Sequence, residues 1–145
     1  MCPALHRRAG RDGARAARCV SLPATAMPFT ARDLESIRQD VAAFAAERDW
    51  DQFHSVRNLL LAVVSEIGEA AEIVRWSGDR DPAVPPDQQQ AWAHELADVF
   101  ILLVRLADRS GVDLSTAFAE KLAIARQKYP VERFRGSNRK YDQQA

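Results

Sequence analysis

Two segments of the sequence each carry a pair of carboxylates spaced three residues apart. Glu66 and Glu69 form one pair, and Glu95 and Asp98 form the other. On an α-helix this spacing places both side chains of a pair on one face, about one turn apart. Most glutamates on helices face water, so two solvated faces are the structural alternative. Each pair adjoins strongly apolar sequence, which instead favours two pairs that face the interior of a helical bundle.

Four carboxylates in a poorly hydrated space repel one another unless some are protonated or a cation lies between them. Hard divalent cations prefer oxygen ligands, and Mg²⁺ keeps several waters and engages substrate phosphates. A di-iron site is the competing interpretation, but such sites usually carry Glu-x-x-His, and no His lies three residues after Glu66 or Glu95. The pattern therefore predicts phosphate-ester chemistry with Mg²⁺ as the cofactor and Mn²⁺ as a substitute. The predicted metal ligands are Glu66, Glu69, Glu95 and Asp98.

Apolar residues that recur at steps of three and four predict the helices that position these side chains. The expected helices cover residues 30–48, 55–76, 87–109 and 114–128. Thr30 with Asp33 three residues later resembles a capping arrangement at the start of the first helix. Gly and Pro residues predict a loop over residues 77–86. No segment alternates as a β-strand does. The predicted fold class is therefore all-α, a four-helix bundle-like protomer with antiparallel neighbours.

The charge of the chain is unevenly distributed. The 145 residues contain 20 basic and 20 acidic side chains, and 47% of the residues are hydrophobic, which excludes a wholly disordered chain. Residues 1–26 hold five arginines and one aspartate, and residues 126–140 hold six basic residues and one glutamate. The remaining residues therefore carry the acidic excess. No apolar run approaches the roughly 20 residues that span a bilayer, so we expect no membrane association.

The first 26 residues differ from the rest in composition. They are rich in Arg and Ala and contain both cysteines, Cys2 and Cys19. We expect a disordered tail there rather than an organelle-targeting segment, followed by one domain over residues 27–145. No aromatic residue is interleaved with the arginines, which argues against nucleic-acid binding. A cysteine-free domain fits a reducing compartment, and we expect a cytoplasmic location.

Three motifs together resemble a known family. They are the run E-R-D-W-D-Q-F-H at residues 47–54, the two carboxylate pairs, and Q-K-Y-P-V-E at residues 127–132. They are similar to motifs of the MazG-like all-α nucleotide pyrophosphohydrolases, dCTP pyrophosphatase branch, over about residues 29–141. The resemblance implies Mg²⁺-dependent hydrolysis of a (deoxy)nucleoside triphosphate, with dCTP or a modified cytosine nucleotide expected, to the monophosphate and pyrophosphate in nucleotide pool sanitation. It also implies a homo-oligomer, commonly a tetramer, with sites built between subunits.

The resemblance implies roles for further residues. Trp50 and Trp76 would flank the base, where stacking contributes roughly 1–3 kcal/mol, and His54 would lie near the same pocket. Glu72 would orient a ligand or act as a base. Each of these residues also has a structural alternative. The tryptophans could pack at the end of the bundle, and His54 could be a hydrogen-bonded structural residue. Glu72 could form a salt bridge with Arg75. The cations implied to face the triphosphate are Lys121, Arg126 and Lys140.

Two positions depart from the family pattern. Leu102 stands where relatives commonly have Tyr, and Ala125 stands where they commonly have Asn. These replacements remove a hydroxyl and an amide that contact substrate in the family, so they bear on substrate preference. The leading hypothesis is a nucleoside triphosphate pyrophosphohydrolase. The alternative, which the two departures favour, is a non-catalytic helical oligomer that binds a nucleotide or a protein partner.

Overall fold

The computed structural model describes residues 29–76 and 84–143. Backbone contacts divide the chain into Met1–Ala31 and Arg32–Ala145, and the described helices all lie in the second unit. Within the described residues there are five α-helices, three short 3₁₀ helices and no strand, which confirms the predicted all-α class. The predicted tail and most of the predicted 77–86 loop fall outside the described residues, so the boundary at residue 27 stays a prediction.

The first helix, α1 (Leu34–Ala46), begins later than the sequence pattern predicts. Asp33 has an extended backbone, and its carboxylate accepts a hydrogen bond from the Ser36 N–H at 2.8 Å. Asp33 is therefore itself the N-cap, because its side chain satisfies a backbone donor that the first turn leaves free. A short 3₁₀ helix, η1 (Trp50–Gln52), follows α1 and is entered through Asp49, which has a φ of 52°.

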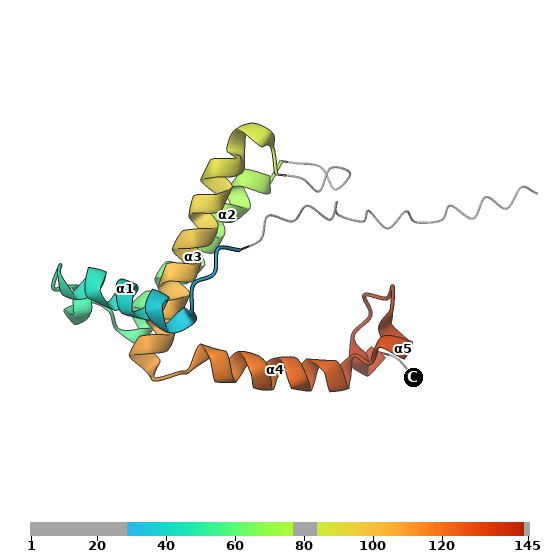
Figure 1. The fold of residues 1–145 in the computed structure, drawn as a ribbon. Coiled ribbons are helices and arrows are strands. Elements are labelled where there is room, and N and C mark those ends of the chain that lie inside the picture. The colour runs from blue at the N-terminus through green and yellow to red at the C-terminus, as the bar shows by residue number, and fades with distance from the viewer. Residues whose placement is uncertain (1–28, 77–83, 144–145) are drawn as a thin grey trace, which may run out of the picture. The chain divides into compact units, whose positions relative to one another are not determined.

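The two longest helices carry the carboxylate pairs and pack along each other. Ser55 caps α2 (Val56–Val74), accepting a hydrogen bond from the Asn58 N–H at 3.1 Å. The 3₁₀ helix η2 (Pro86–Gln88) leads into α3 (Gln89–Ser110), which ends at Gly111 with a φ of 69°. Figure 1 shows α2 in green beside α3 in yellow and orange, and α1 also packs against α3.

The core of the domain is small. Its buried apolar side chains come from the end of α1, from α2 and from α3. They are Ala45, Leu59, Val63, Ala70, Val104 and Ala107. They are spaced four and seven residues apart along α2 and three residues apart along α3, which places them on one stripe of each helix, as amphipathic packing requires. This seam fixes how the two helices, and hence their carboxylates, face each other.

The fourth helix matches its predicted bounds but not its predicted packing. Asp113 caps α4 (Leu114–Lys128), accepting hydrogen bonds from the Ser115 and Thr116 N–H groups. No residue of α4 is buried, so this helix does not complete a four-helix core within one chain. After Pro130 the short α5 (Val131–Phe134) and the 3₁₀ helix η3 (Tyr141–Gln143) form elements that the sequence pattern did not predict.

Large apolar side chains remain exposed on the packed helix pair. On α2 they follow a four- and three-residue spacing at Leu60, Val64 and Ile67, and on α3 the same spacing recurs at Leu96, Phe100 and Leu103. Each helix thus has a second apolar stripe in addition to the one that forms the core. None of the helices in the described part of the chain combines the length and apolar character needed to cross a bilayer.

Candidate active site

The packing of α2 against α3 brings carboxylates from both predicted pairs together. Ligand oxygens of Glu66, Glu69 and Glu95 all lie within 4.8 Å of one another. Glu66 and Glu95 are half-buried, whereas Glu69 is exposed, so the group is open to solvent on one side. Asp98, the fourth predicted ligand, is exposed and lies outside this close group.

The pKa of Glu66 reflects its burial and the carboxylates that lie near it. Burial raises the pKa of Glu66 above its usual value, and the negative charges of Glu69 and Asp98 raise it further. Glu95 acts in the same direction. Because Asp98 contributes to this shift, it is near enough to belong to the same electrostatic site. In the protein alone, the neighbouring carboxylates therefore disfavour the ionised form of Glu66.

The donor set fits a hard divalent cation. All of the converging groups are carboxylates, which supply the oxygen ligands that Mg²⁺ and similar ions prefer. A cation would also relieve the repulsion that raises the pKa of Glu66. The arrangement can thus hold a metal ion, with Glu66, Glu69 and Glu95 as the central ligands and Asp98 beside them.

Trp50 and His54 lie together in the segment between α1 and α2. The Trp50 ring makes edge-to-face contacts with Phe44 at 5.7 Å and with His54 at 6.1 Å between ring centroids. Trp50 keeps 42% of its surface exposed, so it is only partly occupied by packing. His54 is half-buried, and its pKa is lowered mainly by burial and next by the positive charge of Arg105.

Trp76 follows the last turn of α2 and is 84% exposed, so it does not pack at the end of the bundle. The Arg75 guanidinium lies 4.9 Å from the centre of its ring, in a cation–π contact. Arg75 also donates to the Glu72 carboxylate at 2.7 Å. The salt-bridge alternative for Glu72 is therefore present in the structure, and its catalytic role stays a prediction.

The three predicted cations are exposed and apart from the carboxylates. Lys121 and Arg126 lie on α4, and Lys140 follows α5. Among the described residues none of them forms an ion pair with the four carboxylates. A single chain thus does not place these cations in the site, and their phosphate-binding role stays a prediction.

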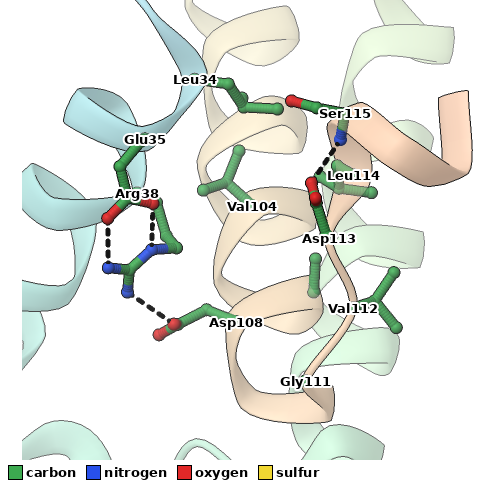
Figure 2. A pocket seen from close by; sticks show the side chains of 11 residues that line it. Leu34, Glu35, Arg38, Val104, Asp108, Gly111, Val112, Asp113, Leu114 and Ser115 are labelled. Carbon is green, nitrogen blue, oxygen red and sulfur yellow. Dashed lines mark hydrogen bonds and ion pairs between the residues drawn. The ribbon is translucent and has the colours of Figure 1, made fainter. Parts of the chain in front are cut away.

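A pocket of about 470 Å³ lies elsewhere, between the start of α1, the end of α3 and the start of α4. Figure 2 shows Leu34, Val104 and Leu114 on its walls, with Arg38 bridging Glu35 and Asp108 at one side. None of the predicted site residues lines it. The pocket is therefore distinct from the carboxylate site.

Sequence reasoning missed Arg105, which is buried on α3 with 4% of its surface exposed. It lies directly after the apolar run from Val99 to Val104, where sequence analysis treated it only as the end of that run. Its position on the core-facing side of the helix was the available signal, because a charged side chain there requires partners.

Comparisons with known proteins identify relatives of this chain. The chain is similar to dCTP pyrophosphatase 1 of Mus musculus, with 53% identity over 111 residues that cover 74% of this chain and 65% of the relative. The chain is also 50% identical to the Homo sapiens protein of the same name, over 111 residues that cover the same shares of the two chains. The chain thus spans about two thirds of the length of these relatives.

A solved structure and a family model extend the comparison. A pyrophosphatase from Archaeoglobus fulgidus superposes with a TM-score of 0.63 and 26% identity, covering 72% of this chain and 98% of that chain. The model of the MazG-like family matches residues 62–143, a range that includes both carboxylate pairs and all of α4. This chain therefore belongs to the MazG-like family.

Proposed function

We propose that this protein hydrolyses a (deoxy)nucleoside triphosphate, dCTP or a modified cytosine nucleotide, to the monophosphate and pyrophosphate. The observation that carries the proposal is the convergence of Glu66, Glu69 and Glu95 from two helices. Three carboxylates at this separation repel one another unless a cation lies between them, and a bound divalent cation can in turn engage substrate phosphates. The proposed role is nucleotide pool sanitation in the cytoplasm.

The similarities to known proteins support the choice of substrate. The mammalian relatives are named dCTP pyrophosphatase 1, and the archaeal structure is titled a pyrophosphatase. Leu102, half-buried on α3, and Ala125, half-buried on α4, are the two apolar departures from the family pattern. Because neither side chain can donate a hydrogen bond, they are the first positions at which preference for base or sugar would differ from that of the relatives.

The proposed cofactor is Mg²⁺, with Mn²⁺ as a substitute, held by Glu66, Glu69, Glu95 and Asp98. When bound, such an ion neutralises phosphate charge and lowers the pKa of an attacking water. The chain's own residues position the substrate. The partly exposed ring of Trp50 and the largely exposed ring of Trp76, which also contacts Arg75, offer surfaces on which the base can stack.

Phosphate binding in this proposal needs a second copy of the chain. The apolar stripes on α2 and α3, and the unburied α4 with Phe118 67% exposed, provide surfaces for self-association. We propose a homo-oligomer, a tetramer, in which Lys121 and Arg126 of one subunit face the carboxylates of another. This arrangement accounts for exposed cations that a single chain keeps apart from the site.

A pyrophosphate-release assay tests the proposal. Canonical and modified triphosphates are incubated with the full chain in Mg²⁺ and separately in Mn²⁺, and cytosine deoxynucleotides are expected to be cleaved fastest. Turnover should be lost in Glu95→Gln and in Asp98→Asn. It should persist in Glu120→Gln, which changes an exposed carboxylate on α4.

The assay also decides between enzyme and binding protein. Calorimetry on the same nucleotide panel measures binding without reference to turnover. Binding with no pyrophosphate release from any triphosphate would replace the enzyme by the non-catalytic oligomer. Turnover that survives in both Glu95→Gln and Asp98→Asn would show that these carboxylates are not the metal ligands.

A further inference from the structure

Arg105 is the only buried charged side chain among the described residues. It lies on α3 seven residues after Asp98, which is about two helical turns along nearly the same face. The helix that carries half of the carboxylate site therefore also carries a buried cation. Burial of a guanidinium is tolerated only where its hydrogen-bonding groups find partners.

Each nitrogen of the Arg105 guanidinium has a partner. One terminal nitrogen donates to Asp51 of η1, and the other donates to the Asp108 carboxylate at 2.5 Å. The remaining nitrogen, Nε, donates to Nδ1 of His54 at 3.3 Å. Arg105 thus connects α3 to two residues, Asp51 and His54, of the segment that carries Trp50.

Asp108, one of the partners of Arg105, is also bound by another arginine. Asp108 also accepts a hydrogen bond from Arg38 of α1 at 2.8 Å, and Arg38 in turn pairs with Glu35 at 2.7 Å (Figure 2). Asp108 is therefore fixed from two directions and cannot rotate away from Arg105 without breaking both interactions. This leaves the guanidinium of Arg105 in one orientation.

A second arginine holds the backbone of the same segment. Arg109 donates to the carbonyl of His54 at 3.0 Å and to the carbonyl of Asp51 at 3.4 Å. These contacts reach only main-chain oxygens, so they restrain the path of the segment but not the state of the His54 ring. Restraint of the ring is left to Arg105 and to the edge contact with Trp50.

The contact to His54 has a chemical consequence. An arginine Nε–H can only donate, so Nδ1 of His54 must accept and carries no proton. In a neutral ring the proton then lies on Nε2. Among residues 29–76 and 84–143 this Nε2 has no hydrogen-bond partner. Within the described residues the His54 ring therefore offers one unpaired N–H donor next to the partly exposed ring of Trp50.

We propose that Arg105 is a positioning residue that fixes the Trp50–His54 segment against α3 and holds His54 with Nε2–H as a donor for substrate. The donor would pair with an acceptor on the base or sugar that stacks on Trp50. Only this last step rests on the proposed function, because the His54 tautomer and the order of the segment are properties of the free protein.

Nitrogen-15 NMR of the histidine ring tests the first part without any turnover. In the wild type, His54 should show an unprotonated Nδ1 and a protonated Nε2 at pH 7.5, with the signal assigned by its loss in His54→Gln. Arg105→Met should give a mixture of tautomers. Arg32→Gln, which removes an exposed arginine that pairs with Asp40, should leave the His54 spectrum unchanged. A wild-type Nδ1–H tautomer overturns the proposal.

Two further variants separate positioning from simple stability. Asp51→Asn alters a half-exposed partner of Arg105 and should fold. Arg105→Lys keeps the positive charge but loses the planar guanidinium that donates to three partners at once. Trp50 fluorescence, measured in a Trp76→Phe, Trp92→Phe background, should become more solvent-quenched in both. When Asp51→Asn and Arg105→Lys are made in the full chain with wild-type tryptophans, the KM for the triphosphate should rise about tenfold in each. The kcat should stay within about twofold of the wild-type value.

The outcomes distinguish this inference from the proposed function. Changed tautomer and fluorescence in an inactive protein would support the positioning role and reject the enzyme. Unchanged tautomer and fluorescence in Asp51→Asn and Arg105→Lys, with equal loss of kcat and kcat/KM, would reject the positioning role while leaving the enzyme in place.

Discussion

The carboxylates of Glu66 on α2 and Glu95 on α3 approach within 4.8 Å across the seam between the two helices. Like charges at this separation repel each other, and the pKa of Glu66 is raised by burial and by its acidic neighbours. The approach is therefore unfavourable for the protein alone and becomes favourable when a cation binds. Opposite effects of one substitution on stability and on activity follow from this relationship.

Glu66→Gln is expected to stabilise the metal-free protein and to abolish activity. Removing one of the converging charges should raise the free energy of unfolding by about 1 kcal/mol in EDTA. Pyrophosphate release in Mg²⁺ should fall about 1000-fold, because several kcal/mol of charge stabilisation are lost. Thermal unfolding and the release assay measure the two effects, with Glu120→Gln as the control. A less stable Glu66→Gln in EDTA would contradict the interpretation.

Addition of Mg²⁺ should raise the thermal stability of the wild type. An ion that binds only the folded state, present at 100 times its Kd, stabilises by about 2.7 kcal/mol. Removal of the ion with EDTA should reverse the shift. The double variant Glu66→Gln, Glu95→Gln should show no Mg²⁺-dependent shift, and a shift of wild-type size in that variant would place the ion elsewhere.

Local signals in the sequence predicted the helices where those signals were unambiguous. Asp113 and Pro130 predicted the bounds of α4 because a cap and a helix breaker act within a few residues. The predicted start of α1 was too early, because a capping arrangement was expected to begin at Thr30, whereas in the structure Asp33 itself accepts the Ser36 N–H.

Tertiary packing decided what the sequence could not. The spacing of three residues placed each carboxylate pair on one face, but the register of α2 against α3 decides that Glu69 joins the close group and Asp98 does not. Arg105 was missed for the same reason, because Asp51 comes from a separate element 54 residues away along the chain. The short α5 carries no periodic signal, since it has only four residues.

Trp50→Ala is expected to weaken substrate binding more than catalysis. Loss of a stacking face of roughly 1–3 kcal/mol corresponds to a rise in KM of about 5- to 150-fold. Trp50→Phe keeps an aromatic face and should retain most of the affinity. Steady-state kinetics on dCTP measures both variants, and a KM for Trp50→Ala equal to that of the wild type would remove Trp50 from the binding site.

The titration of His54 should be visible in the stability of the protein. Burial and the charges of Arg105 and Arg109 lower its pKa, and Asp51 opposes them. Between the folded pKa and the unfolded value of 6.5, the unfolded state binds more protons, so stability falls as the pH decreases below 6.5. Above 6.5 the ring is neutral in both states and contributes nothing.

The control for this pH effect is His54→Gln, whose free energy of unfolding should change less than that of the wild type between pH 7 and pH 5. Chemical denaturation at several pH values measures the difference, and NMR titration gives the His54 pKa directly. A pKa at or above 6.5 in the folded protein would contradict the expected direction.

Subunit mixing tests whether the active site is shared between copies of the chain. Lys121→Ala and Glu95→Gln should each be inactive as pure proteins, because one lacks a phosphate-binding cation and the other a metal ligand. Oligomers formed from equal amounts of the two should regain activity at about a quarter of the sites, where an intact Lys121 meets an intact Glu95. Adding Val64→Lys to both chains, which places a charge on the exposed stripe of α2, should abolish this recovery. Adding Gln90→Lys instead, at another exposed position, is the control and should leave the recovery unchanged. Only a shared site allows two defective chains to form an active one. Absence of recovery in a mixture that native mass spectrometry shows to contain hybrid oligomers would therefore reject a site shared between Lys121 of one subunit and Glu95 of another.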